Sequence, residues 1–376
     1  MIVNKPPMGW NSWNTFGNDI NEQLILDTAD ILIKKGLDKL GYQYVVIDDC
    51  WSLRERDKDG KLVADPEKFP HGMKFLADEL HKKGLKFGMY SCCGLQTCAG
   101  YPSSMDREWI DANTFAEWGV DYLKYDYCFK PSHRQGQELY RNMGMALANC
   151  GRDILFSACN WGADNSPTWI RTTGSDMWRS TGDINDSWAS IKGLLQRQLN
   201  ILPYGGKGCF NDMDMLIVGM NGKGNVALGG CTDDEYKTHF AAWCMLQSPL
   251  MIGGDIRNMD EKYFELLKNQ MLIDICQDSK CAQCYRVDLD SNDSKLALAR
   301  MLDNGDIAIG MFNLKDEDQN INVILNDIGL GTLCGKTLEL TNCWTGEKTI
   351  VKNNNIFYGF KPHSSVVFRG RVIDAK

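Results

Sequence analysis

A cation and a carboxylate stand two residues apart in the segment 120–128, as Lys124 and Asp126. They follow an apolar and aromatic run that is typical of a buried strand. Residues i and i+2 of a strand point to the same face, with Cα atoms roughly 6.5 Å apart. Burying charges is costly, so the pair is either a structural ion pair or a pair that does chemistry. The ends of the other predicted strands favour chemistry.

Those strand ends carry mostly carboxylates and tryptophans, with two cations. In chain order they are Trp10–Trp13, Asp48–Trp51, Tyr90, Lys124–Asp126, Cys159–Trp161, Arg179 with Asp183, and Asp212–Asp214. Carboxylates bind sugar hydroxyls through charge-assisted hydrogen bonds, and indole faces pack against the apolar side of a sugar ring. The pattern therefore predicts a sugar-binding cleft, and it lacks the features that hydride or phosphoryl transfer would need.

Two of the carboxylates could hydrolyse a glycosidic bond, which requires one carboxyl group on each side of the bond. Asp126 is the predicted nucleophile, because the neighbouring Lys124 favours its ionised form. Asp183 is the predicted acid/base, and the negative charge of Asp126 should raise its pKa and keep it protonated at rest. Arg179, four residues before Asp183, is expected to orient it or to hold a hydroxyl.

Each candidate also has an ordinary structural interpretation. Asp48 or Asp49 alone could cap a helix, and Asp183 could be the N-cap of the helix that follows it. Asp212 and Asp214 could form a turn. Tryptophans at strand ends are often core residues. The hypothesis therefore depends on the joint pattern.

Alternating strands and helices must position these residues. Apolar runs predict strands at 8–13, 42–49, 85–90, 121–126, 154–157, 177–180, 208–211 and 249–252, with helical spacing between them, as in 21–35 before Gly36. Eight strand–helix repeats over roughly 250 residues predict a (β/α)8 barrel. An open doubly wound sheet is the alternative, but the glycine-containing segment 221–225 follows no convincing strand and is interpreted as a loop.

After residue 284 the alternation of predicted strands and helices gives way to predicted strands separated by turns. Strands are predicted at 295–301, 306–312, 320–325, 337–340 and 366–369, and Asp303-Asn304-Gly305 is a strong hairpin signal. We therefore predict a catalytic barrel over 1–284 and an antiparallel β-sandwich over 285–376.

Composition narrows the class of partner. The 376 residues carry a net charge of −8, which argues against nucleic acid or an anionic membrane as a partner. No apolar run is long enough for a transmembrane helix, and no secretory signal is visible at the start, so a cytoplasmic protein is expected.

The odd number of cysteines, 15, favours free thiols in a reducing compartment. Neither Cys281 with Cys284 nor the scattered histidines indicate a metal site, and no cofactor is predicted. The sequence gives no oligomeric state.

With these residues assembled, the chain resembles glycoside hydrolase family 27, the α-galactosidases and α-N-acetylgalactosaminidases. The resemblance lies in the motifs at 8–13, 47–51, 124–126, 178–183, 211–215 and 247–250. It implies a (β/α)8 barrel followed by an antiparallel β domain, and hydrolysis of terminal α-linked galactose with retention. It implies that Asp126 is the nucleophile and Asp183 the acid/base. It places in the galactose subsite Trp13, Asp48, Asp49, Tyr90, Lys124, Arg179 and Asp214, with Asp48 and Asp49 on the 4- and 6-hydroxyls.

The resemblance also concerns four cysteines. Cys98 and Cys128 match a pair that is disulfide-bonded in many secreted members, and Cys98 is expected beside the sugar. In a cytoplasmic chain the pair could stay reduced, so both states remain open. Cys50 and Cys159 match family cysteines without their usual partners and are expected to be free thiols.

The sequence departs from the family at Asn160, which precedes Trp161 at the end of the fifth strand. Family α-galactosidases usually carry Glu there, in contact with the 2-hydroxyl, and N-acetylgalactosaminidases carry a small residue. The amide of Asn160 can still donate and accept hydrogen bonds, so galactose is favoured. The alternatives are an α-N-acetylgalactosaminidase or an enzyme that accepts both sugars, a Schiff-base aldolase that uses Lys124, and a sugar-binding barrel without catalysis.

Overall fold

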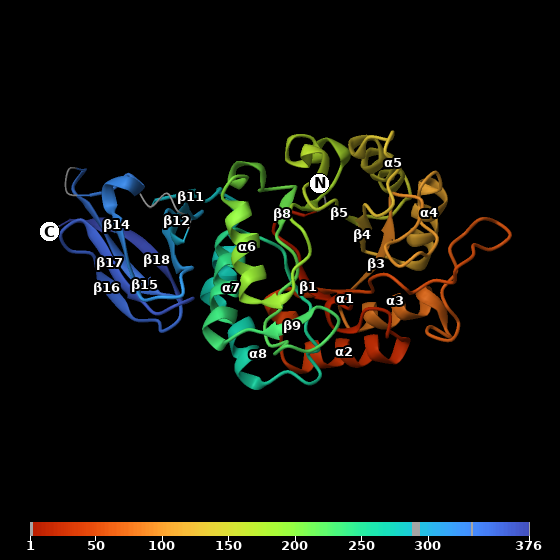
Figure 1. The fold of residues 1–376 in the computed structure, drawn as a ribbon, viewed down its shortest axis with the longest axis horizontal. Helices are drawn as coiled ribbons and strands as arrows, with labels where there is room; N and C mark the ends of the chain where they lie inside the picture. Colours follow the sequence, from red (N-terminus) through yellow and green to blue (C-terminus); the bar gives the residue numbers. More distant parts are fainter. Residues whose placement is uncertain (1–2, 288–293, 332–333, 376) are drawn as a thin grey trace.

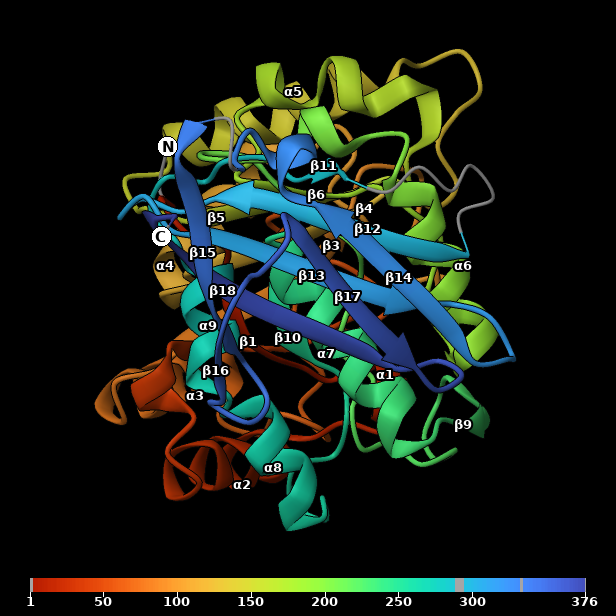
Figure 2. The same cartoon turned by 90° about the vertical axis from the view of Figure 1, so that its left-hand side faces the viewer.

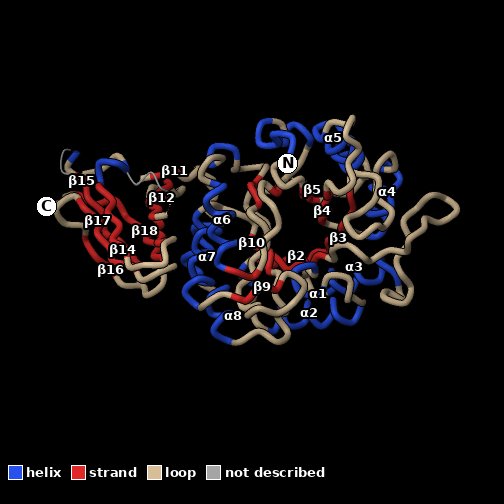
Figure 3. The backbone as a smooth tube through the Cα atoms, in the orientation of Figure 1, coloured by secondary structure: helices blue, strands red, loops and turns tan. Residues whose placement is uncertain are grey.

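The computed structural model describes residues 3–287, 294–331 and 334–375. The larger domain is built around a sheet of eight parallel strands, which lie in the order β10-β1-β2-β3-β4-β5-β6-β8 (Figures 1 and 3). They are β1 (Met8–Asn11), β2 (Tyr42–Val46), β3 (Lys86–Cys92), β4 (Tyr122–Asp126), β5 (Leu155–Cys159), β6 (Met177–Arg179), β8 (Phe210–Asp212) and β10 (Leu250–Ile252). Leu216, just after β8, forms a parallel bridge to Ile252 and donates its N–H to Met251 O at 2.7 Å. This bridge closes the sheet, which confirms the predicted barrel.

Helices surround the strands (Figure 3). They are α1 (Trp13–Phe16), α2 (Glu22–Lys34), α3 (Gly72–Lys82), α4 (Glu108–Trp118), α5 (Gly136–Ala148), α6 (Trp188–Gln198), α7 (Asp233–Met245), α8 (Glu261–Leu267) and α9 (Gln270–Cys276), with short 3₁₀ turns at Asp38–Leu40, Ala163–Thr168, Ile170–Thr173, Leu202–Tyr204 and Leu325–Ile328. α2 begins after Asn21, whose side chain accepts a hydrogen bond from Leu24 N–H, and it ends just before Gly36, at a φ of 72°. No helix within the described ranges is long and apolar enough to cross a bilayer.

The first strand is shorter than predicted. It ends at Asn11 rather than at Trp13, because the Asn11 side chain accepts a 2.9 Å hydrogen bond from the N–H of Trp13, where α1 begins. Trp13 is therefore presented from the first turn of a helix.

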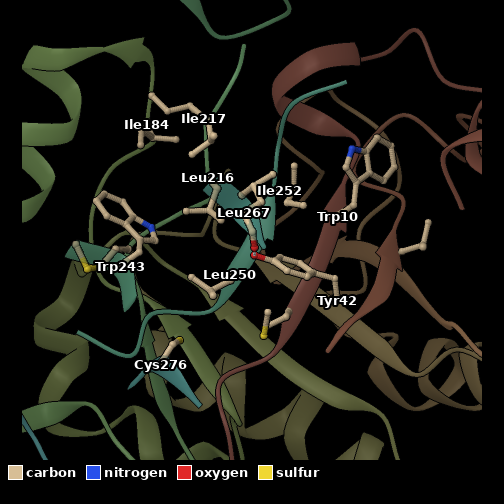
Figure 4. Close-up of a cluster of buried hydrophobic side chains, with 14 of the residues drawn as sticks. Trp10, Tyr42, Ile184, Leu216, Ile217, Trp243, Leu250, Ile252, Leu267 and Cys276 are labelled. Carbon is tan, nitrogen blue, oxygen red and sulfur yellow. Dashed lines mark hydrogen bonds between the residues drawn. The ribbon is translucent and has the colours of Figure 1, made fainter. Parts of the chain in front are cut away.

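Large apolar side chains fill the space between the barrel strands and the later helices (Figure 4). Trp10, Leu250 and Ile252 lie in this cluster and are completely buried. The hydroxyl of Tyr42 is also buried there, and it donates to Leu267 O at 2.9 Å. One satisfied hydrogen bond therefore joins β2 to the end of α8 within this tightly packed apolar cluster.

The β domain packs against one side of the barrel, where it contacts α7 (Figure 1). Its strands are β11 (Tyr285–Arg286), β12 (Lys295–Met301), β13 (Ile307–Asn313), β14 (Gln319–Ile324), β15 (Lys336–Asn342), β16 (Lys348–Ile350), β17 (Asn355–Phe360) and β18 (Ser365–Asp374). Six of them form an antiparallel sheet in the order β11-β12-β13-β18-β15-β16, and β14 pairs with β17. Figure 2 shows this pair crossing the larger sheet, and apolar side chains from both sheets share one core. The predicted antiparallel domain and the hairpin at 302–306 are confirmed, the latter by Leu302 N–H on Asp306 O. The boundary at 284/285 stays a prediction, and residues 288–293 near it lie outside the described ranges.

Arg300 of β12 joins the two domains. It is 1% exposed, and its guanidinium donates to the carbonyls of Met245, at 3.3 Å, and of Ile275. These carbonyls lie at the C-terminal ends of α7 and α9, where a cation satisfies acceptors that have no partner within the helix.

Candidate active site

A cavity of about 640 Å³, open solvent included, lies at the carboxyl ends of the barrel strands. It is lined by Trp13, Asn14, Asp48, Asp49, Tyr90, Cys98, Lys124, Asp126, Trp161, Arg179, Asp183, Asn185, Asp214, Met215 and Val226. Of the twelve site residues predicted from the sequence, Asn160 is the one that is missing from this described lining. The barrel therefore brings the strand ends together as the pattern predicts.

Lys124 pairs with Asp48 rather than with Asp126. Its Nζ donates to Asp48 Oδ2 at 2.8 Å, and Asn11 Nδ2 donates to the same oxygen at 2.8 Å. Burial is the largest single influence and acts to lower the pKa of Lys124, but the charges of Asp48, Cys159 and Asp126 and the hydrogen bond to Asp48 together outweigh it, so the pKa is raised well above its ordinary value. The lysine is therefore charged, which disfavours the Schiff-base alternative.

Asp126 lies deep in the cavity and is 6% exposed. Its Oδ1 accepts from Tyr127 N–H at 2.9 Å, and its Oδ2 accepts from the hydroxyl of Tyr90 at 3.1 Å. Burial raises its pKa to about 6, although the charge of Lys124 acts to lower it. Lys124 thus favours the ionised form, as expected from the sequence, but desolvation has the larger effect on the pKa of Asp126.

Arg179 holds two carboxylates at once. Its Nη2 donates to Asp183 Oδ1 at 2.8 Å, and its Nη1 lies 2.9 Å from Asp214 Oδ1. Asp214 also accepts the N–H of Ile184 at 2.7 Å, so it fixes the backbone beside Asp183. The side chain of Asp183 is 70% exposed. The N-cap of α6 is Ser187, which excludes the capping interpretation of Asp183.

The pKa of Asp183 differs from expectation. Desolvation acts to raise it, but the charge and hydrogen bond of Arg179 lower it below its ordinary value. The sequence-based prediction of a proton on Asp183 at rest is therefore wrong for the unliganded site. The charge of Asp183 in turn acts to raise the pKa of Asp126.

A disulfide borders Asp126. Cys98 and Cys128 are bonded, with Cα atoms 5.2 Å apart, and Cys98 Sγ lies 3.5 Å from Asp126 Oδ2. Asp49 fixes the adjoining segment by accepting Ala99 N–H at 2.9 Å. Burial raises the pKa of Asp49. The pair that the sequence left open is thus oxidised here, whereas Cys50 and Cys159 are free as predicted.

Comparison with known proteins identifies the family. Residues 5–278 match the family model described as "Alpha galactosidase A", and residues 294–369 match the one described as the α-galactosidase C-terminal β-sandwich domain. The chain belongs to the α-galactosidase family. This is the family that the sequence motifs resembled.

Members of the α-galactosidase family match most of the chain. An α-galactosidase of Cyamopsis tetragonoloba is 42% identical over 340 residues, which cover 90% of this chain and 79% of the relative. α-Galactosidase A of Cellvibrio japonicus is 38% identical, covering 92% and 87%. The structure of α-galactosidase I from Mortierella vinacea superposes with a TM-score of 0.91 at 33% identity, covering 99% and 98%. The Saccharomyces cerevisiae α-galactosidase with raffinose gives 0.88 at 31%, covering 98% of each chain.

The segment that departs from the family pattern has an unexpected geometry. Asn160 is 1% exposed, its Nδ2 donates to Ala163 O at 2.9 Å, and its Oδ1 accepts Gly162 N–H at 3.3 Å. Both polar groups are engaged inside its own loop, so a contact with the sugar stays a prediction. Trp161, at a φ of 56°, is the residue of this loop that lines the cavity.

Several other residues at the strand ends have the ordinary structural roles considered in the sequence analysis, as core tryptophans or as turn residues. Trp10 and Trp178 are completely buried core residues, and Trp51 is buried with its indole N–H on Tyr90 O at 2.9 Å. Asp212 accepts the N–H of Asp214 at 2.9 Å, which is the expected turn. Asp212 therefore positions Asp214.

Four lining residues were not predicted: Asn14, Asn185, Met215 and Val226. Met215 belongs to the motif at 211–215 and could have been found there. Asn185 and Val226 lie next to a short parallel pairing of β7 (Asp186–Ser187) with β9 (Ala227–Gly230). Val226 also donates its N–H to Asn14 O at 3.1 Å. Such pairing between irregular loops has no sequence periodicity.

Proposed function

We propose that the protein is a retaining α-galactosidase, which hydrolyses terminal α-linked galactose in oligosaccharides or glycoconjugates. The observation that carries this proposal is that Asp126 and Asp183 line the same cavity at the carboxyl ends of the barrel strands. Relatives at 38–42% identity that are named α-galactosidases support galactose as the sugar.

The positions of the two carboxyls support different roles. Asp126 is buried and fixed by Tyr90 and Tyr127, which suits a nucleophile that attacks the anomeric carbon. Asp183 is exposed and can reach both the leaving oxygen and the water that follows it, which suits the acid/base. In the reaction Asp183 gives a proton to the leaving oxygen and later takes one from the attacking water, while Asp126 is ionised when it attacks.

The remaining charged residues bind the sugar in this proposal. The Lys124–Asp48 pair and Asp49 offer a donor and several acceptors to galactose hydroxyls. Trp13 and Trp161 offer apolar faces. No metal and no cofactor enters the proposed reaction.

Release of galactose from a chromogenic α-galactoside tests the function directly. The purified protein should release galactose at mildly acidic pH, and an Asp126→Asn preparation made in parallel should not. Absence of release by the unmodified protein between about pH 4 and 8 would overturn the proposal.

The pH dependence should report the carboxyl pair. Catalysis needs one proton in the pair, since the nucleophile must be ionised and the acid protonated. Asp183 holds a proton only at low pH and Asp126 has a pKa of about 6, so the single proton is lost as pH rises through about 6. We expect kcat/KM to fall above about pH 6, and a profile that is flat from pH 5 to 8 would contradict the assignment.

Specificity at the second carbon of the sugar can be measured with a matched pair of substrates. Family N-acetylgalactosaminidases carry small residues at the segment that holds Trp161 here, so an acetamido group should clash. We expect kcat/KM to be about 100-fold or more higher for the α-galactoside than for the matched α-N-acetylgalactosaminide. The reverse ratio would establish the alternative activity that Asn160 suggested.

Cytoplasmic localisation stays a proposal. Thirteen of the 15 cysteines are free, and most of these are buried, which supports a reducing compartment. Cys98 and Cys128 are the exception.

A further inference from the structure

Two cysteines and the proposed nucleophile bring three metal-ligand atoms together beside the catalytic cavity. The sulfurs of Cys98 and Cys128 and a carboxylate oxygen of Asp126 all lie within 4.8 Å of one another. Cys98 Sγ is 3.5 Å from Asp126 Oδ2. A zinc ion lies about 2.0–2.3 Å from each of its ligand atoms, so two ligand atoms on opposite sides of it are up to about 4.6 Å apart. The three side chains are therefore close enough to share one ion once both sulfurs are free.

The disulfide that now joins the two sulfurs is open to reductants. Cys98 is exposed and Cys128 is half-buried. Exchange between a thiol and a disulfide requires access to a sulfur, and exposed disulfides are the labile ones. Two molecules of a small thiol supply the two electrons and two protons that convert the S–S bond to two thiols, and they leave as a disulfide of their own. The reducing compartment that the other free cysteines support favours this reduced form.

Backbone contacts hold the two cysteine loops together independently of the disulfide. Leu95 N–H donates to Phe129 O at 3.2 Å, and Cys93 N–H donates to Asp126 O at 3.0 Å. The loops approach so closely that a Cβ at Gly94 would lie 1.9 Å from a carbonyl oxygen of the facing loop. The two thiols should therefore stay beside each other, and beside Asp126, after reduction.

The charge of the cavity favours a cation at this place. Its described lining carries five aspartates, with Lys124 and Arg179 as cations. A cleft with an excess of one sign of charge raises the local concentration of ions of the opposite sign. Both cations are hydrogen-bonded to other carboxylates, whereas Asp126 accepts from two neutral donors, Tyr90 and Tyr127. The carboxylate of Asp126 is thus available to a metal ion.

We propose that reduction of the Cys98–Cys128 disulfide creates an inhibitory zinc site, in which both thiolates and the carboxylate of Asp126 bind one Zn²⁺. Each thiol gives up its proton when the ion binds. Thiolate sulfur and carboxylate oxygen are both zinc ligands, and three of them leave one tetrahedral position open to water. The ion holds the carboxylate that would attack the anomeric carbon, so hydrolysis stops. The inhibition rests on the proposed function, whereas the metal site does not.

Zinc sensitivity of the oxidised and reduced forms tests the regulation. The protein is reduced with a phosphine, which becomes a phosphine oxide with oxygen from water, and the phosphine is removed under nitrogen before Zn²⁺ is added. Rates on an aryl α-galactoside are compared with the same sample without metal. We expect the zinc concentration that halves the rate to be about 10-fold or more lower for the reduced form. Saturating galactose should protect, and equal sensitivity of the two forms would overturn the proposal.

Serine variants locate the ion. The double variant Cys98→Ser with Cys128→Ser lacks both thiolates, so after the same reduction it should keep the low zinc sensitivity of the oxidised protein. Cys334→Ser is the matched control, because Cys334 is an exposed free thiol of the β domain. After reduction this control should be inhibited by zinc like the unmodified protein. If the double variant is as sensitive as the unmodified reduced protein, the ion binds elsewhere and the proposal fails.

Cobalt binding gives a readout that does not depend on activity. Co²⁺ added to the reduced protein should produce a thiolate-to-metal charge-transfer band, and neither the oxidised protein nor the double serine variant should produce it. Asp126→Asn removes the carboxylate ligand, so its affinity for Co²⁺ after reduction should fall about 10-fold. Absence of the band from the reduced unmodified protein would overturn the metal site and leave the α-galactosidase assignment in place. If the band forms but the metal-free protein cleaves no α-galactoside, the metal site stands and the proposed function fails.

Discussion

Asp126→Ala should lower turnover of an aryl α-galactoside by about 10⁴-fold or more, because the variant lacks the carboxylate that forms the covalent glycosyl intermediate in the proposed reaction. The cavity left by the carboxylate is next to the anomeric carbon, so added azide can take its place. It would attack from the side that Asp126 occupied and give the galactosyl azide of inverted configuration. Product configuration by NMR is the measurement.

The same residue offers a control that does not depend on activity. Burial raises the folded-state pKa of Asp126 to about 6, above the ordinary 3.8 of an unfolded chain. Its contribution to stability is therefore fully present below about pH 4 and is lost as pH rises through 6. Asp126→Asn should stabilise the protein at pH 7, by at most about 3 kcal/mol, and the gain should vanish near pH 4. Thermal unfolding at the two pH values would contradict this if the gain were equal at both.

Asp183→Ala should lower kcat/KM by about 10³-fold on substrates with poor leaving groups, since no acid then protonates the departing oxygen. The loss should be much smaller for an aryl substrate whose phenol leaves without a proton. Azide should now attack the glycosyl-enzyme and give the galactosyl azide of retained configuration. Chromogenic assays across phenols of different pKa, with NMR of the azide product, make the measurement.

A control and an opposing outcome complete that experiment. Asp234→Ala removes a carboxylate of α7 whose side chain is 57% exposed, and it should leave kcat/KM unchanged on every substrate. If Asp183→Ala gave the inverted azide and Asp126→Ala the retained one, the two roles would be reversed.

The sequence predicted which residues meet in the cavity, because apolar runs locate strands and the carboxyl ends of barrel strands converge. It did not predict their partners. The charge of Lys124 does favour the ionised form of Asp126, two residues away, as expected, but its hydrogen bond goes to Asp48 at the end of a different strand. The pKa values were misjudged for the same reason, since burial of Asp126 and the reach of Arg179 depend on barrel closure.

Irregular and exposed segments were the least predictable. β16 is exposed at every residue and β17 at most of them, so neither alternates as a half-buried strand should. Val226 reaches the cavity through a pairing with a segment about 40 residues earlier, for which a local pattern gives no sign. Asn160 was expected to contact the sugar in place of the family's usual Glu, yet its amide is used by its own loop.

The contacts of the Arg300 guanidinium make the barrel and the β domain depend on each other when one of them is exchanged for the domain of another protein. Its acceptors, the carbonyls of Met245 and Ile275, belong to barrel helices, whereas Arg300 itself belongs to β12. Recombination between residues 276 and 295 would give the barrel a foreign β domain, and both carbonyls would lose their buried donor unless the new domain carried a cation at the same place. Chimaeras that cross this boundary should therefore be more stable when Arg300 and its two acceptor carbonyls come from the same parent, or from parents that share them, than when they do not.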